Sequence, residues 1–312
     1  MRHVIIRYRT GNQLLRRYEL LIENVAYPAT FFFFLCICNF SYVRFYSFLC
    51  PVSFILPLLQ GMKRIAAAID LLLPRICIVC GRRLLSAERH ICLECMTEMP
   101  LTYFWRQSHN PMSDRFNEII QKWLDKKDSF IKEPYAQAAA LFLYHSENRY
   151  KLIPYHIKYK GDVRAGEYFG RMLGSRLMKE ELWRDADMII PVPLHWSRKF
   201  TRGYNQAEAI AAGISASSGI PLRSDLLIRK RRTRTQTRLD VKSKLENVSG
   251  AFELSETGKA YLKDNPLPAH IILADDVFTT GSTLFACFVA LREVFPPSVR
   301  ISIATLGFVG DL

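Results

Sequence analysis

Two adjacent carboxylates followed by a hydroxyl-rich turn are the residues of this sequence best suited to chemistry. Asp275 and Asp276 come directly after four apolar residues. Behind them lies a short loop of hydroxyl side chains around one glycine, made of Thr279, Thr280, Gly281, Ser282 and Thr283. Apolar residues at helical spacing follow, so the pattern predicts a buried strand, a loop and a helix.

Such a junction suits a ligand that carries both a phosphate and a diol. Backbone N–H groups and the helix dipole favour a phosphate at the loop. Paired carboxylates suit the vicinal hydroxyls of a ribose, or a Mg²⁺ that the sugar and a pyrophosphate share. The loop is not a P-loop, because no Gly-Lys-Ser/Thr ending is present. The alternative is an ordinary strand-to-helix turn with an aspartate near the helix cap.

Two pairs of closely spaced cysteines form the second chemical group. Each pair has two residues between its members, and the four are Cys77, Cys80, Cys92 and Cys95. This spacing lets two thiolates converge on one metal, so two pairs favour a structural zinc site over free cysteines or a redox pair. His90 is surplus to the four, and we expect it on the surface.

A strongly basic segment spans residues 229–244, with eight Lys or Arg and one acid, in a chain of net charge +14. Too few apolar positions are present to bury a face, so we expect a mobile, exposed loop. It fits a solvated run of charge, a lid over a polyphosphate, or a contact to the backbone of DNA or RNA. The residues concerned are Arg229, Lys230, Arg231, Arg232, Arg234 and Arg238.

The elements that must position these groups follow from the apolar pattern. Strands are predicted at 138–144, 188–195, 222–228, 251–254, 271–274 and 299–308, and helices at 63–73, 114–124, 147–159, 166–178 and 203–216. A strand that runs into a tight loop at the carboxyl edge of a sheet is where α/β proteins bind ligands. Lys158 and Lys160 end one helix, as solvated lysines or with Lys160 facing the phosphate site.

Residues 1–61 differ from the rest of the chain. Residues 26–43 carry no charge and include a run of four phenylalanines, and a second apolar run follows at 45–59. The extension fits a membrane anchor, a disordered or poorly packed segment, or upstream sequence outside the natural protein, and we favour the last. We hypothesise that translation starts at Met62. No cysteine pattern requires an oxidising compartment, so the expected location is the cytoplasm, or a membrane if residues 26–59 insert.

The stretch at 271–283 closely resembles the signature of type I phosphoribosyltransferases, which bind 5-phosphoribosyl-1-pyrophosphate (PRPP). In that family the acidic pair holds the ribose 2′- and 3′-hydroxyls and the loop wraps the 5′-phosphate, which implies these roles for Asp275, Asp276 and residues 279–283. The loop after the preceding strand cradles pyrophosphate there, which points to Val192, Pro193 and Leu194. The cations that follow and would neutralise a diphosphate are Arg198, Lys199 and Arg202. The basic segment matches the place of the family's flexible catalytic loop.

From residue 74 to residue 308 the chain resembles the ComF/GntX-like family, which joins a Cys₄ zinc module to a type I phosphoribosyltransferase domain. The stretches that carry the resemblance are the cysteine pairs, IKYKGD at 157–162, PVPLHWSRKFTRGYNQAE at 191–208, RTQT at 234–237, NVSGAF at 247–252 and residues 271–283. It implies an α/β fold with a mainly parallel sheet flanked by helices. The implied parts are an extension outside the family at 1–61, a zinc-ribbon-like module at 62–110 and a phosphoribosyltransferase-like domain at 111–312.

The family is associated with DNA uptake during natural competence, so the resemblance implies a DNA-handling role for a PRPP-binding fold. The implied cofactors are structural Zn²⁺ and the Mg²⁺ that accompanies PRPP, and the implied partners are PRPP or a related nucleotide, single-stranded DNA and the uptake machinery. An active phosphoribosyltransferase of nucleotide metabolism and a non-catalytic nucleotide sensor are the alternatives. Some purine enzymes of the fold place an aspartate base where this chain has Thr279, and threonine cannot act as that base at neutral pH. The sequence therefore assigns no catalytic residue and no acceptor base.

Overall fold

A parallel sheet in the strand order β1-β6-β5-β2 forms the centre of the structure. The structure is a computed structural model and describes residues 74–126, 132–195, 202–230 and 250–310. The strands are β1 (Ala138–Leu143), β2 (Met188–Pro191), β5 (His270–Phe278) and β6 (Arg300–Phe308). In register, Ala274 of β5 pairs with Ala304 of β6 on one side and Pro191 of β2 on the other.

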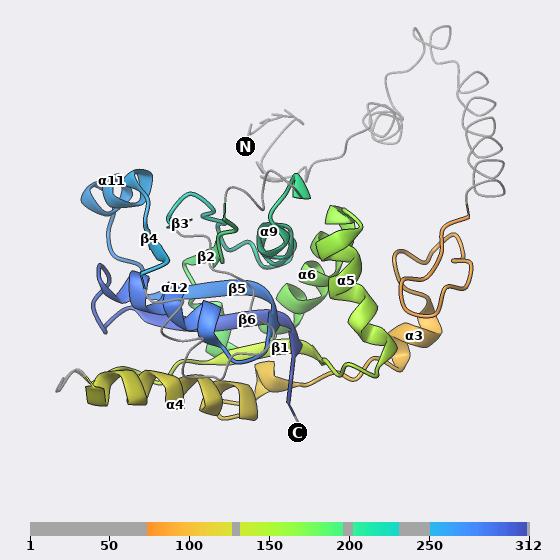
Figure 1. The fold of residues 1–312 in the computed structure, drawn as a ribbon, viewed down its shortest axis with the longest axis horizontal. Helices are drawn as coiled ribbons and strands as arrows, with labels where there is room; N and C mark the ends of the chain where they lie inside the picture. The colour runs from red at the N-terminus through yellow and green to blue at the C-terminus, as the bar shows by residue number, and fades with distance from the viewer. Residues whose placement is uncertain (1–73, 127–131, 196–201, 231–249, 311–312) are drawn as a thin grey trace, which may run out of the picture. The chain divides into compact units, whose positions relative to one another are not determined.

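These strands are mainly apolar and almost entirely buried because helices cover both faces of the sheet. Successive side chains of β5 point into different cores, so that Ile271 and Leu273 lie in one and Ile272 and Ala274 in the other. The first core includes α4 (Pro111–Lys126) and α12 (Ser282–Arg292). The second includes α5 (Leu152–Tyr159), α6 (Val163–Leu177) and α9 (Gln206–Ser218). Figure 1 shows α4 on one side of the sheet and these three helices on the other. The predicted α/β fold with a parallel, helix-flanked sheet is confirmed.

Helices α6 and α9 pack unusually closely, because glycines face one another between them. A Cβ atom added at Gly170 would lie 2.2 Å from the carbonyl oxygen of Ile210. Only glycine therefore allows the two backbones to approach this closely. The contact fixes α9, whose first turn borders the site described below.

A small cysteine-containing region precedes the sheet. It includes α3 (Leu93–Thr97), and its chain then runs through the 3₁₀ turn Phe104–Arg106 into α4. Hydrogen bonds join this region to strand β1, for example from the N–H of Leu143 to the carbonyl of Pro100. The Tyr150 hydroxyl donates to the carbonyl of Cys95 at 2.7 Å. Its buried residues and those around α5 and α6 form one continuous apolar cluster.

A separate antiparallel pair of strands, β3 (Leu227–Arg229) and β4 (Phe252–Leu254), brackets the basic segment. Helix α11 (Glu256–Asp264) follows β4, and the short α7 (Glu181–Arg184) precedes β2. Because Arg229 pairs with Phe252, the two ends of the intervening segment start side by side.

Several element boundaries differ from the predicted ones. The helix predicted at 147–159 is a 3₁₀ turn, Arg149–Lys151, followed by α5, whose first turn accommodates Pro154. β2 ends at Pro191, four residues earlier than predicted, and β5 continues four residues beyond Ala274. The predicted helix at 63–73 and the extension at 1–61 lie outside the described residues. Within the part of the chain that the structure describes, no helix combines the length and hydropathy needed to cross a bilayer.

Candidate functional site

The acidic pair lies where β5 loses one of its neighbours. β2 ends opposite Ala274, whereas β6 stays paired with β5 as far as Phe278. Asp275 and Asp276 follow Ala274 directly and are both buried. The carboxylates therefore lie within β5, at the carboxyl edge of the sheet. At this point β5 is paired with β6 but no longer with β2.

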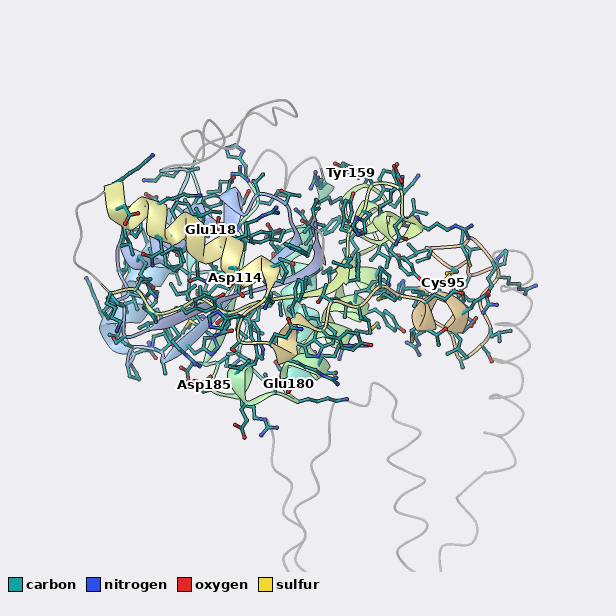
Figure 2. All side chains as sticks on the ribbon, turned by 90° about the horizontal axis from the view of Figure 1, so that it is seen from below. Cys95, Asp114, Glu118, Tyr159, Glu180 and Asp185 are labelled. Carbon is teal, nitrogen blue, oxygen red and sulfur yellow. The ribbon has the colours of Figure 1, made fainter. Side chains whose placement is uncertain are left out.

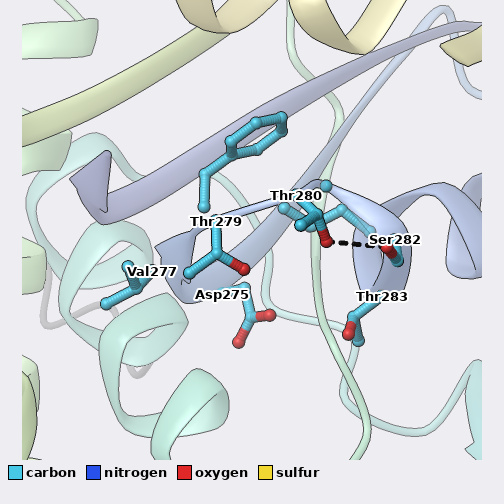
Figure 3. Close-up of a pocket in the computed structure, with 9 residues that line it drawn as sticks. Asp275, Val277, Thr279, Thr280, Ser282 and Thr283 are labelled. Atoms are coloured by element: carbon cyan, nitrogen blue, oxygen red, sulfur yellow. Dashed lines mark hydrogen bonds between the residues drawn. The ribbon is translucent and has the colours of Figure 1, made fainter. Parts of the chain in front are cut away.

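The loop after β5 borders a small hollow, of about 30 Å³, that is open to solvent. Figure 3 shows the residues around it, with Asp275 facing the hydroxyl groups of the loop. The Thr280 and Ser282 hydroxyls are hydrogen-bonded at 2.7 Å. The structure thus brings Asp275 and all five predicted loop residues together around one space. Asp276, on the alternate side of the strand, does not line it.

Gly281 shapes this loop at the start of α12. Its φ is +75°, and a Cβ atom there would lie 2.8 Å from the ring of Phe278. Gly281 is also the N-cap residue of α12, and no side chain makes a capping bond there. The first N–H groups of the helix are therefore not satisfied by a side-chain cap, which is the arrangement that favours an anion.

Arg115 of α4 ties this loop to the end of the last strand. Its guanidinium donates to the carbonyl of Thr279 at 3.2 Å and to that of Val309 at 3.1 Å. The same group lies 5.8 Å from the centre of the Phe308 ring. Sequence analysis did not identify Arg115, because it is distant in sequence from both carbonyls.

The acidic pair is held by a short network. The N–H of Asp276 donates to Oδ1 of Asp275 at 2.8 Å. Burial and the neighbouring Asp276 raise the pKa of Asp275 to about 7, although Lys158 acts in the opposite direction. Nζ of Lys158 lies 2.8 Å from Oδ2 of Asp276, an ion pair whose angles are not those of a hydrogen bond.

Lys158, and not Lys160, is the lysine that reaches the acidic pair. Burial lowers the pKa of Lys158, and Asp276 outweighs this and raises it. Lys160 is exposed just beyond the helix. Lys158 follows the buried Pro154 by four residues and so shares its helix face, which is a signal that the sequence contained.

The loop after β2 lies next to the carboxyl end of β5. Val192 N–H donates to the carbonyl of Ala274 at 2.9 Å, and the Val192 carbonyl accepts from Asn205 Nδ2 at 3.1 Å. Pro193 and Leu194 continue from it and are half-buried. Arg202 donates to Gln206 Oε1 at 3.2 Å, whereas Arg198 and Lys199 lie outside the described residues.

Tyr204 is a further polar group near this loop that sequence analysis missed. Its hydroxyl is buried and makes no hydrogen bond to the described residues. Burial raises its pKa, although Arg202 acts in the opposite direction. A buried hydroxyl that makes no hydrogen bond is costly, so among the described residues Tyr204 is a group that a polar ligand atom could satisfy.

The basic segment is described only at its start. Arg229 lies with its guanidinium 5.0 Å from the centre of the Phe252 ring, and Lys230 forms an ion pair with Glu253. Arg231, Arg232, Arg234 and Arg238 lie outside the described residues. The predicted lid or nucleic-acid contact therefore stays a prediction.

The four predicted metal ligands do converge. The Sγ atoms of Cys77, Cys80, Cys92 and Cys95 all lie within 4.8 Å of one another, and those of Cys80 and Cys92 are 3.7 Å apart. A tetrahedral zinc with bonds of about 2.3 Å has sulfur–sulfur edges of about 3.8 Å, so this set fits zinc. N–H of Cys92 donates to Sγ of Cys77 and N–H of Cys95 to Sγ of Cys92, both at 3.4 Å, as suits thiolate ligands.

The thiols differ in acidity. Burial raises the pKa of Cys77, but backbone donors of Cys80, Cys92 and Val79 outweigh it and bring the pKa to about 7. Burial and the neighbouring thiols raise the pKa of Cys95. His90 is not a surface residue as predicted, since it is half-buried against the ring of Tyr168 with Nδ1 3.4 Å from Oδ2 of Asp162. The cause is the packing of the cysteine region on α6, whose N-cap is Asp162.

A second polar cluster lies at the opposite, amino end of the sheet. Nδ1 of His270 is 3.0 Å from Asp185 Oδ1, and Nε2 is 2.7 Å from the hydroxyl of Ser302. Ser302 is only 2% exposed. His270 is likewise buried, so the two residues bridge β5 and β6 inside the fold.

Known proteins resemble part of the chain. No family model matches the sequence. Competence protein F of Haemophilus influenzae is 34% identical over 116 residues, which cover 37% of this chain and 48% of that protein. DNA utilization protein YhgH is 34% identical over 102 residues in Salmonella typhi and 33% over 100 residues in Escherichia coli K12, in each case 31% of this chain and 40% of the relative. Over these residues the chain is similar to ComF-like proteins.

The matched parts span less than half the length of these curated relatives. This similarity agrees with the resemblance that the sequence showed, and the cysteine cluster and the parallel sheet occur in the same chain. The names of the relatives refer to competence and to DNA utilization. They say nothing of PRPP.

Proposed function

We propose that this ComF-like protein binds PRPP or a related phosphorylated ribose at residues 275–283 and serves in the uptake or processing of DNA, in the cytoplasm. The observation that carries the proposal is the hollow in which Asp275 faces the loop Thr279–Thr283 at the start of α12. One side of this space offers a carboxylate and the other offers hydroxyls and helix N–H groups. A ligand that bears a diol and a phosphate complements both sides.

Asp275 and Asp276 accept hydrogen bonds from the ribose hydroxyls under this proposal. Asp276 Oδ2 is buried with Lys158 beside it and makes no hydrogen bond to the described residues, so it keeps acceptor capacity. Residues 279–283 hold the 5′-phosphate. The unpartnered hydroxyl of Tyr204 supports the presence of a polar ligand at this edge.

The pyrophosphate end of the ligand lies along the loop after β2. In the loop Val192, Pro193 and Leu194, the backbone donor for a phosphate is the N–H of Leu194, because that of Val192 donates to Ala274 and proline has none. Arg198, Lys199 and Arg202 contribute positive charge. Mg²⁺, when bound, would neutralise the pyrophosphate further, and the acidic pair is its nearest source of carboxylate oxygens. The basic residues from Arg229 to Arg238 either close over the ligand or contact a nucleic acid.

The DNA part of the proposal is supported by the names of the relatives and by charge. The chain carries a net charge of +14, which favours a polyanion, and two named relatives act in competence and DNA utilization. The Cys₄ site, with zinc bound, holds the cysteine region in shape.

Isothermal calorimetry with PRPP tests the ligand. The double variant D275N/D276N should lose most PRPP affinity. An amide oxygen accepts a hydrogen bond from the ribose hydroxyls more weakly than a carboxylate oxygen does. The exposed acid change D264N serves as the matched control and should leave affinity unchanged. Unaltered binding in the double variant would remove the acidic pair from the site.

A pyrophosphate-release assay with a panel of bases then distinguishes binding from turnover. Release that depends on one base would support the phosphoribosyltransferase alternative, and PRPP binding without release would support a sensor. Anisotropy measurements with single-stranded DNA test the other half of the proposal. R231A/R232A/R234A should weaken DNA binding and flatten its dependence on salt, since each lost phosphate contact reduces the slope.

A further inference from the structure

Two neighbouring tyrosines are exposed on helix α5. Tyr155 is 45% exposed and Tyr159 is 63% exposed, although both are large aromatic side chains. They are four residues apart and therefore on one face of the helix, with ring centres 5.2 Å apart. The rings form a small aromatic surface that no described part of the chain covers.

Arg202 extends this surface. Its guanidinium lies 5.3 Å from the centre of the Tyr159 ring. Tyr155, Tyr159 and Arg202 therefore form a row of flat groups, here named the tyrosine row. An aromatic ring and a guanidinium plane both present faces on which a nucleobase can stack.

The surroundings of the tyrosine row are positively charged. Residues 149–164 contain five Lys or Arg and one acid, Asp162. Asp162 is engaged by His90 and by the N–H of Ala165, so it offers little charge to oppose an anion. Lys151, Lys160 and Arg164 are exposed. A strand of phosphates would find several cations beside the aromatic faces.

The tyrosines are turned away from the buried face of α5, which carries Ile153 and Ile157. Lys158 lies between these two faces and contacts Asp276. The tyrosines are thus not needed to pack α5, and they share the helix with a residue of the proposed sugar site. Figure 2 shows Tyr159 at an edge of the molecule, where a chain-like ligand has access.

We infer that the tyrosine row binds the bases of single-stranded nucleic acid by stacking, while the neighbouring lysines and arginines hold its phosphates. The inference rests on the DNA-handling half of the proposed function and adds the surface that performs it. Bases of a duplex are stacked on one another and cannot reach these rings, so the row favours single strands over duplexes.

Fluorescence anisotropy of a labelled oligo-dT strand, with a duplex of equal length in parallel, tests the inference. Y155A/Y159A should weaken single-strand binding by about 10-fold or more. The salt dependence of binding should stay unchanged, because no phosphate contact is removed. Y155F/Y159F keeps both rings and should bind nearly as well as the natural sequence.

Tyr103 provides a matched control. It is 46% exposed and has the guanidinium of Arg106 5.4 Å from its ring centre, so it has the same local chemistry. Arg106 pairs with Glu180, and Figure 2 places Glu180 and Tyr159 at opposite edges. Y103A should leave DNA binding unchanged. The melting temperature of every variant should match that of the natural sequence and shows that they are folded.

Three results would overturn the tyrosine row: full binding by Y155A/Y159A, equal losses in the alanine and phenylalanine variants, or an equal loss in Y103A. A natural sequence that binds no single-stranded DNA would refute the DNA half of the proposed function and this inference together. Binding by the natural sequence that survives Y155A/Y159A refutes the tyrosine row alone.

Discussion

The ammonium group of Lys158 lies against the buried carboxylate of Asp276. Its positive charge offsets the negative charge of Asp276, which would otherwise repel the carboxylate of Asp275 and any phosphate nearby. When a diol binds Asp276, the lysine remains available to the negative end of the same ligand. It therefore links the sugar and phosphate parts of the proposed site.

We expect K158Q to lower both stability and PRPP affinity. Removal of one partner from a buried pair costs about 3–5 kcal/mol, and the 28% exposure of Lys158 reduces the expected loss to about 2 kcal/mol. Urea denaturation and calorimetry measure the two effects. K160Q is the control, since Lys160 is exposed, and it should change the free energy of unfolding by less than about 0.5 kcal/mol. Equal effects of the two substitutions would contradict the assignment.

Asp275 predicts a dependence of stability on pH. Its pKa is raised to about 7 by burial and by Asp276. Between its ordinary pKa of about 4 and this value, the unfolded chain has lost the proton and the folded chain keeps it, so stability falls as pH rises. Above pH 7 the effect is complete and constant.

The amide of D275N does not titrate. The free energy of unfolding of D275N, minus that of the natural sequence, should therefore rise by a few kcal/mol as the pH is raised across this window. Denaturation at pH values below and above the window, for both proteins, isolates the effect from all other titrating groups. A flat difference for D275N would show that the folded and unfolded pKa values agree.

The acidic pair and the hydroxyl loop could be predicted because their residue types are contiguous in sequence. Lys158, Arg115 and Tyr204 could not be assigned in the same way, because each reaches the site from another element. Only Lys158 left a usable signal, through its helix face.

The junction of β5, its loop and α12 is the element on which the proposed phosphate site depends. Gly281 has a positive φ, and the Phe278 ring occupies the space a side chain would need. The loop thus has two separate reasons to require glycine. Its neighbours Thr280 and Ser282 keep their hydroxyls together only while this turn is kept.

G281A should lower the free energy of unfolding by about 2–4 kcal/mol, from the strained φ and the clash combined. G219A is a control that separates the two causes. Gly219 has φ +78° but open space around it, so its substitution should cost about 1 kcal/mol. Thermal unfolding compares them, and PRPP titration should show a loss for G281A alone. Equal destabilisation would mean that the Phe278 contact relaxes freely.

Element types were easier to predict than their ends. Apolar runs identified the strands of the sheet, because helices bury both of its faces. The extension of β5 through Asp275 and Asp276 was missed because two acids resemble the end of a strand. Pairing of Asp275 with Thr305 and of Phe278 with Phe308 continues the ladder regardless of side-chain polarity.

Polar contacts join the cysteine region directly to the elements beside the proposed sugar site. The Tyr150 hydroxyl reaches the carbonyl of Cys95, and His90 reaches Asp162, the N-cap of α6. Burial raises the pKa of Tyr150 to about 12, so its hydroxyl keeps the proton that it donates. A metal bound to the four thiolates therefore stabilises more than its own loops.

Zinc removal should lower the melting temperature of the whole chain and weaken PRPP binding. The reason is that α5, which carries Lys158, starts next to the Tyr150 contact. Calorimetry with and without chelator measures both, and Zn²⁺ but not Mg²⁺ should restore them. Y150F removes one hydrogen bond, keeps all four thiols, and should cost about 1 kcal/mol with zinc retained. Unchanged PRPP affinity after chelation would show that the two regions act independently.

Sequence spacing predicted the metal cluster, yet it could not predict where the cluster packs. The contacts of His90 and Tyr150 join residues from separate predicted segments. Such pairings depend on the path of the whole chain, which local periodicity does not contain.

The chain Asp185–His270–Ser302 has the order of partners found in serine hydrolases, but its serine is only 2% exposed. Hydrogen-bonded triplets of this kind can thus arise as internal struts between two strands. What makes such a triplet an enzyme is an approach path for the molecule that reacts. In this protein an open hollow lies at the other end of the sheet. It is lined by Asp275 and by the hydroxyl groups of the loop after β5, which do not form such a triplet.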